Sequence, residues 1–174
     1  MNKLLEIVFN IMLMRQLPQD LPYSQDLLKW LLVLYGVSGV IALQMAFTPS
    51  IALLQTLFDV CFLVVILWSA LHLLKREARF VQVLTALMAI GVVFQLISIP
   101  FMYALYHEDK SSTFYTLSVF ALFACLVWNL SLVAYILRHA LEIKQIQAVA
   151  ATLLYYISLT VIANSLFDFG LPAA

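Results

Sequence analysis

Charge is scarce in this sequence. Asp, Glu, Lys and Arg together make up 10% of the 174 residues, whereas 65% of the residues are hydrophobic. A water-soluble domain needs polar side chains to cover its surface and usually contains roughly 45 to 50% apolar residues. The shortage of charge therefore excludes an ordinary soluble domain and predicts a protein embedded in a lipid bilayer.

The sequence also has no net charge, no catalytic motif and few cysteines. Basic and acidic residues balance at 9 each, so no net field attracts nucleic acid. Phosphate-binding loops, zinc-ligand spacings, nucleophile elbows and paired catalytic carboxylates do not occur in the sequence. The only two cysteines, Cys61 and Cys125, lie in apolar runs, where a free thiol behaves as a small hydrophobic side chain. We therefore predict a non-enzymatic protein without a metal or a cofactor.

Long apolar runs account for most of the chain. They cover residues 27–47, 51–74, 80–106, 113–137 and 147–170. Each run reaches the length of about 20 residues at which a helix crosses a bilayer and satisfies its own backbone donors and acceptors. The sequence therefore predicts an all-α integral membrane protein with a five-transmembrane-helix bundle over residues 27–174. Gly170 and Pro172 are typical stop signals for the fifth helix.

Residues 1–26 form a different kind of segment. A narrow polar stripe with helical spacing runs through the otherwise apolar start of the chain and consists of Lys3, Glu6 and Asn10. This pattern predicts an amphipathic helix at the membrane interface, and the acidic Glu6 argues against a signal peptide. Pro18 and Pro22 interrupt the helix and predict a linker. Ser24 or Asp26 can then cap the first spanning helix.

Basic residues are unevenly distributed along the chain. The stretch LHLLKREARFVQ concentrates Lys75, Arg76 and Arg79 between the second and third runs. With five crossings, eight of the nine basic residues share one side, and Lys110 alone lies opposite; the eight are Lys3, Arg15, Lys29, Lys75, Arg76, Arg79, Arg138 and Lys144. The positive-inside rule then predicts a cytoplasmic N-terminus and a C-terminus on the other side.

The same basic residues are candidates for binding. Anionic lipid head groups attract basic side chains close to the cytoplasmic surface of a membrane. We therefore predict head-group or partner contacts for five of these residues, namely Lys75, Arg76, Arg79, Arg138 and Lys144.

Asp59 is an ionisable residue inside the second apolar run. Because a charged group is costly in the bilayer, it marks a candidate site. Asp59 lies about 12 Å from the outer end of its helix at 1.5 Å per residue. A polar layer is expected around it, formed by Asp59, Gln55, Gln95, Asn164 and Asn129. Such a layer either binds a proton or ligand or holds the helices together by hydrogen bonds. Asn129 follows Trp128 near mid-membrane, and we expect the polar atoms of both to point into the bundle.

Two histidines end the second and fourth spans on the cluster side. His72 and His139 therefore lie at comparable height, as two axial ligands of a haem would. Both adjoin basic residues at the membrane surface, however, so we interpret them as interfacial histidines.

Two stretches of the chain resemble a known family. They are LWSALHLLKREARFVQVLTALMAIGVVFQLISIP and VWNLSLVAYILRHALEIKQIQAVAATLLYYIS. In helix count, turn positions and hydropathy they resemble the Yip family, five-pass membrane proteins named for interaction with Rab GTPases, which includes small bacterial members. The resemblance implies a five-helix bundle with a cytoplasmic N-terminus that acts through membrane or protein contacts. Only 26 residues precede the first span, so a Rab partner is not implied.

Two functions are consistent with these patterns. The first is a protein of the bacterial inner membrane that organises the bilayer or interacts with itself or other membrane proteins. The alternative is a small transport or lipid-scrambling subunit that uses the polar layer around Asp59.

Overall fold

The computed structural model describes residues 2–167, with side chains for residues 4–166, and contains only helices over that range. The α-helices are α1 (Asn2–Met12), α2 (Gln25–Leu43), α3 (Pro49–Leu73), α4 (Phe80–His107), α5 (Thr113–Leu141) and α6 (Gln145–Phe167). Two short 3-10 turns, η1 (Pro18–Asp20) and η2 (Glu77–Arg79), precede α2 and α4. Helices α2 to α6 are long and apolar enough to cross a membrane. The predicted all-α fold with five spanning helices is therefore confirmed, while the predicted stop at Gly170 and Pro172 lies outside the described residues.

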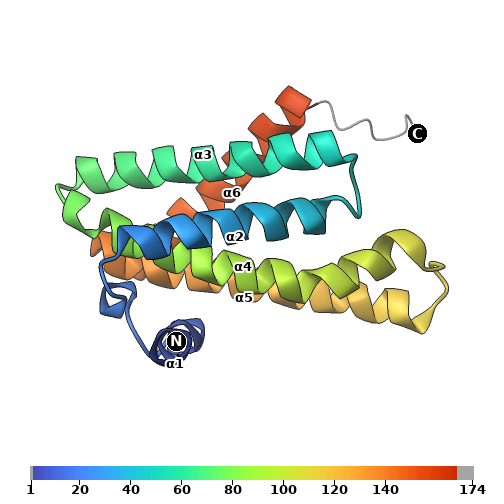
Figure 1. The fold of residues 1–174 in the computed structure, drawn as a ribbon, viewed down its shortest axis with the longest axis horizontal. Coiled ribbons are helices and arrows are strands. Elements are labelled where there is room, and N and C mark those ends of the chain that lie inside the picture. Colours follow the sequence, from blue (N-terminus) through green and yellow to red (C-terminus); the bar gives the residue numbers. More distant parts are fainter. Residues whose placement is uncertain (1, 168–174) are drawn as a thin grey trace.

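Helix α4 is the centre of the bundle. It packs against α2 and against α5, while α3 packs on α2, and α6 contacts both α5 and α3. Figure 1 shows α2 to α5 running lengthwise, with α6 crossing behind them at an angle. Among the five spans α4 is the most buried, and its inward residues include Val83, Leu84, Leu87 and Met88. Three of the other spans, α2, α3 and α5, therefore contact α4, and α6 packs outside on α5 and α3.

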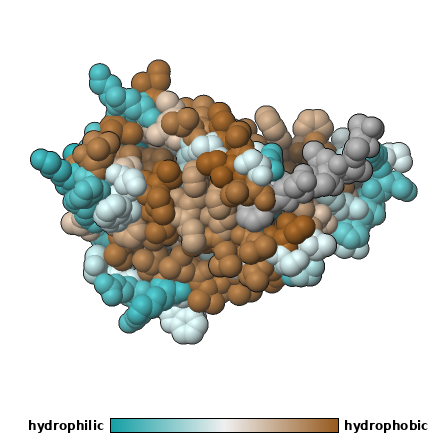
Figure 2. Space-filling view, turned by 90° about the horizontal axis from the view of Figure 1, so that it is seen from above, coloured by the Kyte–Doolittle hydropathy of each residue, from teal (hydrophilic) through white to brown (hydrophobic). Residues whose placement is uncertain are grey.

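The surface of the bundle is apolar along its middle. The face of the molecule seen in Figure 2 has hydrophobic side chains over its central part and hydrophilic ones toward both ends. Exposed large residues include Phe120 and Phe123 on α5 and Leu154 and Val161 on α6. A surface of this kind is disfavoured in water and matches a bilayer. The chain is a multi-pass membrane protein.

Local chemistry sets where the spans begin and end. The Ser24 hydroxyl accepts a hydrogen bond from the Leu27 N–H at 3.2 Å, so Ser24 caps α2. Helix α5 runs to Leu141, four residues beyond the predicted end at 137. Residues of this last turn are partly buried, and their packing favours the longer helix. It stops at Glu142, which has a left-handed backbone with φ 51°. The connection expected over residues 138–146 is thus reduced to residues 142–144.

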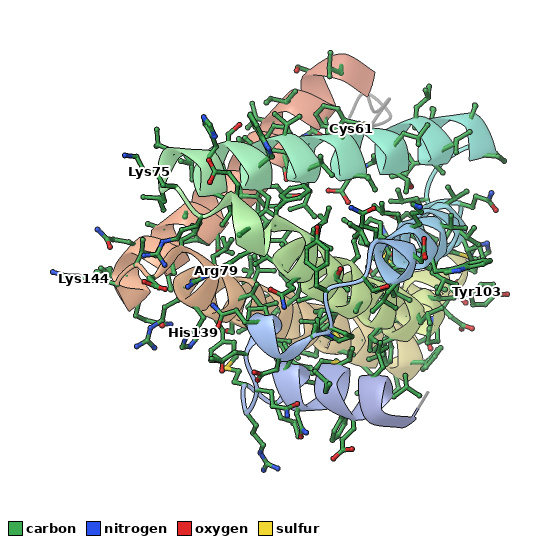
Figure 3. The ribbon with its side chains drawn as sticks, turned by 60° about the vertical axis from the view of Figure 1, so that its left-hand side comes forward. Cys61, Lys75, Arg79, Tyr103, His139 and Lys144 are labelled. Atoms are coloured by element: carbon green, nitrogen blue, oxygen red, sulfur yellow. The ribbon has the colours of Figure 1, made fainter. Side chains whose placement is uncertain are left out.

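Helix α1 lies across the bundle. Figure 1 shows it nearly end-on beside the lengthwise α4 and α5, and Figure 3 shows it from the side. Val8, Ile11 and Met12 are buried, whereas Leu5 and Phe9 are exposed. The helical segment that the polar stripe predicted is present, and its position at a membrane interface stays a prediction.

Candidate functional site

A partly open cavity lies between the helices and is lined by residues of all five spans. Its volume is about 360 Å³. Its polar lining consists of Tyr35 from α2, Gln55, Thr56 and Asp59 from α3, Gln95 and Ser98 from α4, Asn129 from α5, and Tyr155 and Tyr156 from α6. A space of this size falls within the range of small-molecule sites, roughly 300 to 1,000 Å³.

Asp59 joins three helices at the cavity. The Tyr35 hydroxyl of α2 donates a hydrogen bond to Asp59 Oδ2, and the Tyr155 hydroxyl of α6 donates to Asp59 Oδ1 at 3.2 Å. Each carboxyl oxygen thus has one hydroxyl donor. The ring of Phe62 packs against Tyr155 with the centroids 5.6 Å apart. These contacts hold the carboxyl group in one place between α2 and α6.

Two further polar pairs flank this centre. The Ser38 hydroxyl donates to Gln95 Oε1 at 2.5 Å and joins α2 to α4. The Tyr156 hydroxyl donates to Asn129 Oδ1 at 2.5 Å and joins α6 to α5. Hydrogen bonds between spans are worth about 0.6 to 2 kcal/mol each. The polar residues therefore contribute to helix association as well as lining the cavity.

One polar atom in this region is left without a partner. Gln55 Oε1 is buried and makes no hydrogen bond to the described residues. Gln55 lies one helical turn before Asp59 and lines the same cavity. A buried carbonyl oxygen normally has a donor, because leaving it unpaired costs free energy. A donor bound in the cavity would satisfy it.

Four members of the predicted polar layer come together in this cavity and one does not. Asp59, Gln55, Gln95 and Asn129 all line it, whereas Asn164 is exposed. The helical period explains the difference. Asn164 is about two and a half turns beyond Tyr155, which turns its side chain to the opposite face of α6.

The tyrosines of the site were not predicted from the sequence. A charged or amide residue stands out in an apolar run, whereas a tyrosine is amphipathic and is ordinary in a membrane helix. Helix depth could have identified one of them. Tyr35 is eight residues from the end of α2, or about 12 Å at 1.5 Å per residue, which is the depth expected for Asp59.

Trp128 and Asn129 point in different directions. Asn129 faces the cavity, as expected, but the Trp128 indole N–H donates to the Met12 carbonyl of α1 at 3.3 Å. Successive residues on a helix point about 100° apart, so the two cannot share one direction. The Trp128 ring packs edge-on against Phe94 of α4 at 5.3 Å, so it contacts the bundle, but its polar atom bonds α1 and not the cavity. The Tyr135 hydroxyl makes a similar bond to the Gln16 carbonyl at 3.3 Å, so α5 anchors the end of α1.

The basic residues gather at one end of the bundle. Figure 3 shows Lys75, Arg79, His139 and Lys144 together at one end and Tyr103 at the other. Here Glu142 accepts from Arg76 at 2.5 Å and from Arg79 at 2.6 Å. We call these three residues the Glu142 clamp, because they tie the α3–α4 connection to the end of α5.

Arg79 also completes the end of α5. Its guanidinium donates to the carbonyls of His139 at 3.4 Å and Ala140 at 3.3 Å. The last carbonyls of a helix have no partner within the helix and carry partial negative charge, so a cation stabilises them. The clamp therefore has a structural role at this helix terminus.

The clamp reduces the number of unpaired basic side chains at this end of the bundle. The two arginines lower the pKa of Glu142 to about 2, and Glu142 raises the pKa of Arg76. Both arginines are therefore occupied by a carboxylate. Of the five predicted head-group contacts, Lys75, Arg138 and Lys144 are exposed, and Arg138 donates to Gln145 Oε1 at 3.2 Å.

The two histidines at this end each have local partners. His72 Nδ1 lies 2.8 Å from Glu77 Oε1, and its ring stacks on Trp68 at 5.0 Å. The His139 ring meets Tyr135 edge-on at 4.6 Å. Each histidine therefore contacts residues close to it in the sequence, at the end of its own helix.

The comparisons with known proteins add no relative. No protein-family model, curated protein or solved structure matches this chain. The resemblance to the Yip family stays a prediction.

Proposed function

We propose that this chain is a small membrane transport subunit whose solute site is the cavity around Asp59. The observation that carries the proposal is the position of Asp59, which lies in a cavity lined by all five spans and is bound by hydroxyls from α2 and α6. An ionisable group at this depth is costly, so its presence favours a functional site. A site bounded by every helix can change its access when the helices move relative to one another.

The weak packing on one side of the cavity supports this proposal. Helices α2, α4 and α5 form an extensively packed unit, whereas α3 and α6 meet each other over a smaller contact. The Asp59–Tyr155 bond joins α3 to α6 where that contact is formed. Movement of α3 and α6 away from each other would therefore widen the cavity while α4 keeps its contacts with α2 and α5.

Access from both sides of the membrane tests the proposal. In a chain with Cys61→Ala and Cys125→Ala, the cavity residue Ser98 is replaced by Cys and exposed to a thiol reagent that cannot cross the bilayer. We expect labelling of Ser98→Cys in both right-side-out and inside-out vesicles, because a transported solute must leave the cavity on either side. Labelling in only one orientation would contradict transport.

The same helix provides a control for this experiment. Leu96 is exposed on the outside of α4, where it would face lipid. A thiol at this position has no water beside it, so we expect Leu96→Cys to remain unlabelled in both vesicle types. Equal labelling at positions 96 and 98 would show that the reagent reaches the thiols through the lipid.

A second candidate function is interaction with anionic lipid or other membrane proteins, as a membrane-organising component. It is favoured by the exposed basic side chains Lys75, Arg138 and Lys144 at one end of the bundle. Basic residues near the cytoplasmic surface attract anionic lipids by about 1 kcal/mol each. The two functions need different residues, since this one depends on the three cations and not on Asp59.

The proposed setting is the bacterial inner membrane. The concentration of basic residues at the end that carries Lys75 and Lys144 favours a cytoplasmic position for that end. The N-terminus would then be cytoplasmic and the C-terminus periplasmic. A small bacterial member of the Yip family would have this arrangement.

A further inference from the structure

The chemistry of the cavity indicates which solutes it accepts. Among the described residues that line it, Asp59 is the only Asp, Glu, Lys or Arg. None of the ion pairs among residues 4–166 involves Asp59, and each basic residue of those pairs lies elsewhere. The site therefore contains an acidic group without a cationic protein partner, which favours a cation and disfavours an anion.

The hydrogen-bonding groups beside Asp59 also indicate which ligand fits. The hydroxyl protons of Tyr35 and Tyr155 are directed to Asp59, and that of Tyr156 is directed to Asn129. The lining keeps one unpaired acceptor, Gln55 Oε1, one helical turn from Asp59, while the amide N–H groups of Gln55, Gln95 and Asn129 are donors. A tyrosine hydroxyl has one proton and can still accept a bond after donating it. A ligand group that lies between Asp59 and Gln55 Oε1 must therefore be a hydrogen-bond donor.

The walls specify the rest of the ligand. The cavity is lined by aromatic rings and by aliphatic side chains, among them Phe58, Phe94, Leu63, Ile90 and Leu159. Aromatic faces attract cations, and apolar walls favour an apolar ligand body. The described residues contain no group of three His, Cys, Asp or Glu that could hold a metal ion. The volume of about 360 Å³ also exceeds what a single bare ion would fill.

We propose that the cavity binds an organic ammonium ion, that is, a protonated amine with a small apolar body. Its N–H groups donate to Asp59 and to Gln55 Oε1, and its apolar part lies against the aromatic and aliphatic walls. This inference rests on the proposed function, because it names the class of solute for the same cavity.

Binding of size-matched probes to the purified full chain in detergent tests the inference. Phenethylammonium is compared with neutral 2-phenylethanol and anionic 3-phenylpropionate, and hexylammonium with hexanol and hexanoate, by calorimetry and by the shift in Tm. We expect both ammonium ions to bind at least tenfold more tightly than their neutral and anionic partners. Equal affinity within each set, or no binding by either ammonium ion, would overturn the inference without any variant being needed.

Variants connect the binding to the cavity. Asp59→Asn should weaken ammonium binding at least tenfold, whereas Asp26→Asn should leave it unchanged, because Asp26 pairs with Lys29 on the surface. Gly39→Ala should also weaken it, since an added Cβ would meet Gln95 Nε2 and Thr56 Cγ2 at 3.0 Å. Gly36→Ala, where a Cβ meets nothing within 4 Å, is the matched control. Full binding by both Asp59→Asn and Gly39→Ala would place the ammonium site elsewhere and overturn the inference.

The labelling experiment and the binding experiment can fail independently of each other. Selective ammonium binding with one-sided labelling of Ser98→Cys would support the ligand class and remove the transport function. Two-sided labelling without selectivity for ammonium would retain transport and remove the ligand class.

Discussion

At the scale of single residues, Asp59 and the tyrosines that bind it form the centre of the candidate site. Tyr35 and Tyr155 come from helices that are far apart in the sequence, and each donates to a different oxygen of the same carboxyl group. A phenol combines a large apolar ring with one donor. Tyrosine can therefore serve a carboxyl group inside a membrane protein without adding another charge.

The contribution of Tyr35 can be measured by removing its hydroxyl. Tyr35→Phe keeps the ring but leaves Asp59 Oδ2 without its donor, so we expect the free energy of unfolding to fall by about 1 kcal/mol. Unfolding of the purified protein in a denaturing detergent gives this value. Combining the change with Asp59→Asn in a double-mutant cycle should show coupling between the two positions.

Tyr103→Phe is the matched control for this prediction. Tyr103 lies near the end of α4, is half exposed and stacks on His107. Surface substitutions usually change the unfolding free energy by less than about 0.5 kcal/mol. Equal losses in the two variants would mean that the hydrogen bond to Asp59 adds nothing to stability.

At the scale of the helices, the Glu142 clamp connects two pairs of spans. Arg76 lies between α3 and α4, Arg79 ends η2, and Glu142 follows α5 in the short connection to α6. The clamp therefore fixes one end of the bundle, where the chain reverses direction twice. The looser contact between α3 and α6 lies away from it. This arrangement leaves α3 and α6 freer to move beside the cavity than at the clamped end.

The clamp should have a defined pH dependence. The pKa of Glu142 is lowered from 4.5 to about 2, so its ionised form stabilises the folded state fully above pH 4.5 and loses this effect as the pH falls toward 2. We expect wild type to be more stable than Glu142→Gln by a constant amount between pH 8 and pH 5. The difference should shrink below pH 4.5. Unfolding curves at pH 8, 6, 4 and 3 measure it.

An acid at the opposite end provides the comparison. Glu108 is exposed after α4, so Glu108→Gln should change stability little at any of these pH values. A difference between wild type and Glu142→Gln that already declines from pH 8 to pH 6 would contradict an ion pair of this strength.

At the scale of the whole molecule, composition was sufficient to predict the fold class. Runs of about 20 apolar residues have few alternatives to a spanning helix, because lipid leaves no other partner for the backbone. The ends of the helices were harder to predict than the fold class. The left-handed backbone of Glu142 that stops α5 has no glycine to signal it. Asn164 was placed in the polar layer by depth alone, and depth does not say which face of a helix a residue occupies.

The topology of the molecule is itself a prediction with a direct test. If the end with the basic residues is cytoplasmic, the chain begins in the cytoplasm and ends on the other side after five crossings. A fluorescent reporter fused before Met1 should then be active, while the same reporter fused after Ala174 should be silent and a periplasmic phosphatase active there. Activity of one reporter at both ends would contradict an odd number of crossings.

The attachment of α1 has a consequence for biosynthesis. The Trp128 indole that holds the end of α1 lies 116 residues after Met12, and the Tyr135 hydroxyl lies 119 residues after Gln16. A ribosome makes α1 before α5, so α1 emerges long before these two hydrogen-bond donors exist. Its packing on α4 can form earlier, but these two bonds must wait until the fourth span has been made and inserted.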